Sequence, residues 1–145
     1  MLRSRLRADD GFTLVELLVA VLIIGILVAT GLATLLNQRG KAQDAEAKTA
    51  VVTAAKAIEA FGTDHGGYAG ATVDDLAKVE PSLAQARGLK VASTETTYTV
   101  TVNSLAAPGA EYSVARDGSG ESIRDCSLPG TGACRVTADA RGNRW

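Results

Sequence analysis

The chain has 145 residues, of which 46% are hydrophobic, and a formal net charge of −1 at pH 7. This length suits one domain with a modest core, and the near-neutral charge does not suggest a nucleic-acid partner, so we expect no direct nucleic-acid binding. Much of the hydrophobic content lies in residues 17–36, LLVAVLIIGILVATGLATLL, which contain no charged side chain. Twenty helical residues rise roughly 30 Å, about the thickness of a bilayer's hydrocarbon core. The segment predicts a membrane-spanning helix at about residues 14–36.

The first residues, MLRSRLRADDG, precede the apolar segment and indicate a signal. They place three arginines within seven residues and stay polar as far as Gly11. An ordinary secretory signal has a short apolar region followed by a small-residue cleavage site, for which ATGLA at 29–33 is a weak candidate. Here the apolar run continues into a second helical pattern, which is not typical of such a signal.

The octapeptide GFTLVELL at residues 11–18 resembles the prepilin cleavage and methylation motif, G-F-T-L-x-E. Over residues 1 to about 36 the chain is similar to members of the type IV pilin superfamily. The resemblance implies that a membrane prepilin peptidase cuts between Gly11 and Phe12 and methylates the new amino group. A leader of residues 1–11 is then removed, and the apolar segment stays in the mature chain.

Glu16 has two possible roles. With Thr13 it forms the spacing of a capping box, which satisfies backbone groups at a helix start. A glutamate beside a lipid-facing segment also costs several kcal/mol at most depths unless it is paired. The resemblance implies pairing with the terminal amine of Phe12 in an adjacent subunit. The two roles are compatible, and we assign Glu16 to assembly.

The orientation of the span follows only weakly from charge. Basic residues precede it at positions 3, 5 and 7 and follow it at positions 39, 41 and 48, so the positive-inside rule leans slightly toward a cytoplasmic amino end. The resemblance and the downstream cysteines place the leader in the cytoplasm and the bulk of the chain outside. We expect a single-pass inner-membrane precursor that becomes part of an extracellular pilus or a periplasmic filament.

Two cysteines, Cys126 and Cys134, lie in a segment rich in Gly, Ser and Pro, with seven residues between them. On the oxidising side of a membrane two nearby cysteines usually pair, which predicts a small disulfide loop. If this end faced the cytoplasm, two free thiols packed as small apolar groups would be favoured instead.

The second part of the chain indicates an α+β fold. Val51, Ala54, Ile58 and Phe61 are spaced by three, four and three residues, which predicts one long helix over 12–62 that Gly62 ends. Charged residues, among them Asp44, Lys48 and Glu59, are expected on its soluble faces. A connector and a small antiparallel sheet domain follow over 63–145, with a short helix at 73–78, strands at 89–93, 97–103, 111–116, 122–124 and 135–137, and turns at Pro108-Gly109 and Asp117-Gly118.

Reactive chemistry finds little support. The single histidine, His65, lies in a Gly-rich connector and is expected at the surface. Gly40-Lys41 lacks the remaining residues of a phosphate-binding loop, and Asp117–Glu121 lacks the full ligand series of a calcium loop, so a hairpin turn explains the latter better. We expect no enzyme activity, no cofactor and no metal site.

The leading hypothesis is a structural subunit of a type IV pilus-like, homo-oligomeric helical filament. Its expected partners are further copies of the chain, the prepilin peptidase, the pilus or secretion assembly machinery, and the membrane before assembly. A pseudopilin of a type II secretion system is the main alternative, although the disulfide loop slightly favours a surface pilin. A single-pass membrane-anchored binding protein or enzyme, with a coincidental motif, is the third hypothesis.

Overall fold

The computed structural model describes residues 11–145 and has the predicted α+β arrangement. The chain divides into two compact units, one up to Asn37 and the other from Gln38 to Trp145. Apart from Gly11, the predicted leader lies outside the described residues. In chain order the elements are α1 (Leu14–His65), α2 (Val73–Val79), the 3-10 helix η1 (Pro81–Gln85), and the strands β1 (Lys90–Ser93), β2 (Tyr98–Asn103), β3 (Glu111–Arg116) and β4 (Ser122–Cys126).

Helix α1 ends three residues later than predicted. A Cβ at Gly62 would overlap the ring of Tyr68, so this glycine is a packing position and not the end of the helix. The helix stops at His65, because the next residue, Gly66, has a φ of +76°. This left-handed conformation is the usual glycine termination of a helix. His65 itself is exposed, as expected, and stacks on the Phe61 ring.

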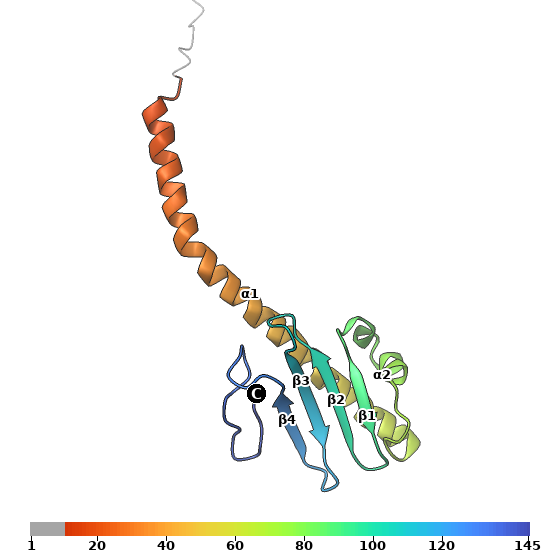
Figure 1. Cartoon of the computed structure of the whole chain (residues 1–145). Helices are drawn as coiled ribbons and strands as arrows, with labels where there is room; N and C mark the ends of the chain where they lie inside the picture. Colours follow the sequence, from red (N-terminus) through yellow and green to blue (C-terminus); the bar gives the residue numbers. More distant parts are fainter. Residues whose placement is uncertain (1–10) are drawn as a thin grey trace, which may run out of the picture. The chain divides into compact units, whose positions relative to one another are not determined.

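The four strands form one antiparallel sheet in the order β1-β2-β3-β4, beside the second half of α1 (Figure 1). The central pair, β2 and β3, is in register from Tyr98↔Arg116 to Asn103↔Glu111. The predicted turn after β3 is confirmed: the Asp117 carboxylate accepts hydrogen bonds from the backbone N–H groups of Ser119 and Glu121 at 2.9 and 3.0 Å. This hairpin connects β3 to β4.

The core lies between α1 and one face of the sheet. Alternate residues of β2 are buried, and so are Tyr112 and Val114 of β3, because successive side chains of a strand point to opposite faces. Leu76 of α2 and Leu83 of the 3-10 helix η1 complete the core. The α1 side chains buried in this cluster are Ala47, Val51, Ala54, Ala57, Ile58 and Phe61.

Two differences from the predicted elements concern the end of the sheet and the connector. The predicted strand at 135–137 is wrong, because Arg135 makes one backbone hydrogen bond, to the Arg144 carbonyl, and Val136 is 70% exposed. A single hydrogen bond does not add a strand to the β-sheet. The 3-10 helix η1 was not predicted, although its proline at the first helical position is typical of a helix start.

Candidate functional site

The predicted cleavage position lies in an accessible, non-helical segment ahead of α1. Gly11 and Phe12 precede the helix, and the Phe12 side chain is 85% exposed. A Cβ at Gly11 would meet no atom within 4 Å, and its φ is not in the left-handed region. Nothing in the described part of the chain therefore requires glycine at position 11.

Thr13 caps the helix without using the Glu16 carboxylate. The Thr13 Oγ1 accepts a hydrogen bond from the Glu16 backbone N–H at 3.2 Å, and the Thr13 carbonyl accepts one from the Leu17 N–H at 3.2 Å. This is half of the predicted capping box. The Glu16 carboxylate has no hydrogen-bond or ion-pair partner among the described residues, so it is available to a group from outside the chain.

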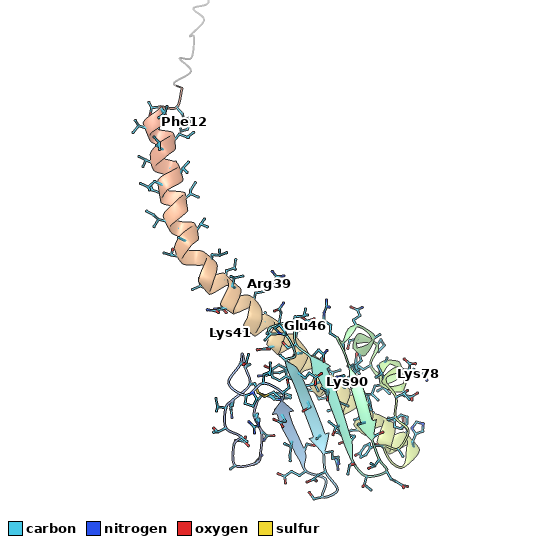
Figure 2. The ribbon with its side chains drawn as sticks, viewed as in Figure 1. Phe12, Arg39, Lys41, Glu46, Lys78 and Lys90 are labelled. Carbon is cyan, nitrogen blue, oxygen red and sulfur yellow. A yellow bond between two sulfur atoms is a disulfide. The ribbon has the colours of Figure 1, made fainter. Side chains whose placement is uncertain are left out.

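The first part of α1 presents an exposed apolar surface (Figure 2). It is long and apolar enough to cross a membrane, and none of its most apolar window is buried. Its two threonines turn their hydroxyls inward: Thr30 donates to the Leu27 carbonyl at 3.1 Å and Thr34 to the Gly31 carbonyl at 2.7 Å. In the sequence, Glu16 is the single ionisable side chain of residues 14–36. Large exposed side chains include Leu14, Val15, Leu17, Leu18, Leu22, Ile23, Ile24, Ile26, Leu27, Val28, Leu32, Leu35 and Leu36.

The two cysteines form the predicted disulfide. Cys126, the last residue of β4, is bonded to Cys134, with their Cα atoms 5.9 Å apart, and both residues are buried. The alternative of two free thiols is therefore wrong for this structure. The bond closes the loop between β4 and the final residues of the chain.

A buried carboxylate beside this loop was missed by the sequence analysis. Asp44 of α1 is only 2% exposed. Its Oδ1 accepts a hydrogen bond from Ser104 Oγ at 2.7 Å, and its Oδ2 accepts one from the Ala133 N–H at 2.9 Å. Lys48, one turn along the helix, donates from Nζ to the Ala133 carbonyl at 3.1 Å. Burial lowers the pKa of Lys48, against an opposing effect of the Asp44 charge.

The expectation that Asp44, Lys48 and Glu59 lie on soluble faces is wrong for Asp44, which is buried, and holds only in part for Lys48 and Glu59, which are half-buried. The signal was present in the spacing. Ala47 and Asp44 extend the buried pattern of Val51 and Ala54 backward by four and three residues, which places Asp44 on the core side of the helix.

A second polar cluster connects α1 to the sheet. The Glu59 carboxylate accepts hydrogen bonds from Tyr68 Oη at 2.7 Å, from Tyr98 Oη at 3.0 Å and from the Arg116 guanidinium at 2.7 Å. Burial raises the pKa of Glu59, but the three donors together outweigh it and hold this pKa below its usual range. The cluster joins the helix to β2, β3 and the connector and so has a structural role.

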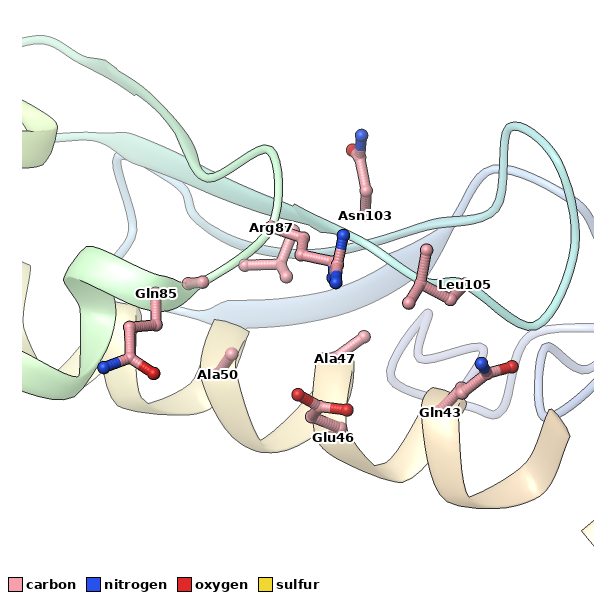
Figure 3. Close-up of a pocket in the computed structure, with 10 residues that line it drawn as sticks. Gln43, Glu46, Ala47, Ala50, Gln85, Arg87, Asn103 and Leu105 are labelled. Carbon is pink, nitrogen blue, oxygen red and sulfur yellow. The ribbon is translucent and has the colours of Figure 1, made fainter. Parts of the chain in front are cut away.

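A small cavity lies between α1 and the segments that follow η1 and end β2 (Figure 3). Its volume is about 30 Å³, which is room for about one water molecule. Gln43 and Glu46 of α1 lie on one side, and Arg87 and Leu105 on the other. This cavity does not admit a small-molecule substrate, whereas three more open surface hollows of the sheet domain have volumes of about 600, 350 and 450 Å³. Within residues 11–145 no group of three or more His, Cys, Asp or Glu side chains could hold a metal ion.

Comparison with known proteins identifies the amino-terminal segment. The family model described as the prokaryotic N-terminal methylation motif matches residues 6–32, which include Gly11, Phe12, Glu16 and most of the apolar segment. No curated protein and no solved structure matches the chain significantly. The chain thus carries the prokaryotic N-terminal methylation motif, which is the signature of type IV pilins and pseudopilins.

Proposed function

We propose that the chain is a precursor that prepilin peptidase cuts between Gly11 and Phe12, and that the product is a structural subunit of a type IV pilus-like filament. The leader is residues 1–11, and the mature chain consists of α1 and the sheet domain. One observation carries the proposal: the first part of α1 is an uncovered apolar helix whose single ionisable side chain, Glu16, lies at its amino end without a partner in the described residues.

The exposed apolar surface needs a cover, because each Leu, Ile or Val side chain that leaves water gains about 1.5–3 kcal/mol. A bilayer supplies that cover before assembly. In a filament, the same segments of neighbouring copies supply it to one another. The helix suits both surroundings, since its backbone is hydrogen-bonded internally and the Thr30 and Thr34 hydroxyls bond to it.

Glu16 then supplies the register. Cleavage creates an α-amine at Phe12, which is mostly protonated at neutral pH because its ordinary pKa is about 7.7–8.0. An ammonium and a carboxylate 4 Å apart attract each other by about 4 kcal/mol at an effective dielectric constant of 20. Only a stagger that brings the Phe12 amine of one copy to the Glu16 of the next satisfies both groups away from water.

The experiment compares Glu16→Ala with Thr13→Ala in cells that make filaments. Thr13→Ala removes the capping hydroxyl and keeps the carboxylate, so it isolates the cap. We expect both variants to be cleaved and inserted into the membrane. Glu16→Ala should lower filament yield by about tenfold or more, while Thr13→Ala should stay near wild type, since a lost cap costs only about 1 kcal/mol. Wild-type yield from Glu16→Ala, at equal amounts of processed subunit, would contradict the assembly role.

The two alternative functions differ in measurable ways. A pseudopilin of a type II secretion system carries the same motif, but its filament is periplasmic and its assembly depends on the secretion machinery. A membrane-anchored binding protein would keep residues 1–11. Identifying the assembly machinery that the chain requires distinguishes a pilus subunit from a pseudopilin. The amino-terminal residue of the mature chain distinguishes both from a membrane-anchored binding protein.

A further inference from the structure

Residues 127–145, which we call the strap, follow β4 and contain no helix or strand. Their order therefore depends on a few ties to the rest of the sheet domain. One tie is the disulfide at Cys134. Others lie at the far end, where the Arg144 N–H donates to the Arg124 carbonyl at 2.8 Å and the Trp145 indole N–H to the Asp125 carbonyl at 2.7 Å.

The hydrogen bonds between the strap and α1 involve the backbone of one strap residue, Ala133, and Lys48 Nζ also lies 5.6 Å from the centre of the Trp145 ring. The N–H of Ala133 donates to Asp44 Oδ2, and the carbonyl of Ala133 accepts from Lys48 Nζ. Two side chains of α1, the acceptor Asp44 and the donor Lys48 one turn further on, thus bind the backbone of the strap. The second Asp44 oxygen holds Ser104, which fixes the orientation of the carboxylate.

The strap has one residue adapted to this contact. Gly132 has a φ of +58°, and a Cβ at this position would overlap Asp44 Oδ2. Both the left-handed backbone and the close approach favour glycine. The carboxylate and the strap are therefore complementary in shape as well as in hydrogen bonding.

The residue that docks is adjacent to the residue that is crosslinked. We propose that oxidation of Cys126 and Cys134 closes the strap on α1, with Asp44 as its receiving group, and that reduction opens the strap while α1 and the sheet stay folded. Closure passes two protons and two electrons from the thiols to a disulfide-bearing oxidant by thiol–disulfide exchange, and opening is the reverse reaction, in which a dithiol gives the two electrons and two protons and becomes a disulfide. Most of the core is built from residues outside the strap, among them Val51, Ile58 and Val100, and the strap adds Cys134 and part of Trp145 at its edge. This device goes beyond the filament role and is testable without filaments.

The first test is hydrogen exchange, followed by mass spectrometry, on the full chain in detergent micelles with and without dithiothreitol. Reduction should speed exchange at Ala133 and Cys134 by about 80-fold, which corresponds to the closure entropy of a loop of about nine residues. Val100 and Val114, paired at the centre of the sheet, should stay slow. Unchanged exchange at Ala133 would overturn the proposal, and so would an equal loss of protection at Val100.

The second test keeps the disulfide and removes the receiving group. Asp44→Asn, under oxidising conditions, should speed exchange at Ala133 by about tenfold or more, because the N–H loses a charged acceptor. Glu46→Gln is the matched control, since Glu46 lies on the same helix, is exposed and makes no hydrogen bond with another described residue. Gly132→Ala gives an independent test if Asp44→Asn fails to fold, because it alters only the strap. Wild-type exchange at Ala133 in Gly132→Ala or in a folded Asp44→Asn would overturn the role of Asp44.

Discussion

Replacing Glu59 by glutamine should weaken the attachment of α1 to the sheet in a pH-dependent way. The carboxylate accepts three hydrogen bonds, and hydrogen bonds to a charged group contribute about 1.5–3 kcal/mol each when buried. The side chains of Glu59 and Arg116 are 38% and 32% exposed, so solvent screens the cluster and the sum must be discounted. We expect a loss of about 2 kcal/mol at pH 7, or roughly 8 °C in Tm for a unit of about 108 residues.

The pH dependence identifies the cause. Because the pKa of Glu59 is lowered by folding, its contribution is fully present above the ordinary value of 4.5 and disappears as the pH falls through the lower folded pKa. Thermal unfolding of wild type and Glu59→Gln should therefore differ at pH 7, and the difference should be smaller at pH 3. Glu46→Gln, an exposed carboxylate on the same helix, should match wild type at both values. A deficit of equal size at pH 3 and pH 7 would refute the charge-based reasoning and leave only a packing effect.

Two further predictions concern the core and alkaline pH. Leu76→Ala should lower the free energy of unfolding by about 2–5 kcal/mol, because Leu76 is 0% exposed. Val79→Ala, at an exposed position of the same helix, should change it by less than about 0.5 kcal/mol. Equal effects of the two substitutions in urea titrations would contradict the packing of α2. Burial, together with the nearby Asp44 charge, raises the pKa of Tyr112 to about 12, so stability should be fully present below the ordinary value of 10.0 and fall as the pH rises toward 12. Tyrosinate absorbance would show this, and ionisation of all tyrosines near pH 10 in the folded chain would count against it.

Much of the fold could be predicted because the signals are local. The strand-forming residues of β2 and β3 and the turn at Asp117 appear in the sequence over a few residues, and the structure has these elements at or within one residue of the predicted positions. The end of α1 could not be predicted from Gly62 alone. Position 62 needs a residue without a Cβ because the Tyr68 ring lies against it, and this contact depends on the tertiary structure.

The polar part of the structure was harder to predict. The spacing of Asp44 indicates the core side of α1, but its partner Ala133 could not be predicted, because the two residues are far apart in sequence. The same holds for Glu59 and Arg116. The amino-terminal motif, by contrast, was predictable from its residues, because its partners are other molecules and its pattern does not depend on the rest of the chain.

The most direct test of the filament role is the intact mass of this chain in filaments sheared from the cell surface. The proposal predicts that the chain is present there, begins at Phe12, lacks residues 1–11 and retains the bond between Cys126 and Cys134. Finding the chain only in membranes, with residues 1–11 still attached, would contradict it.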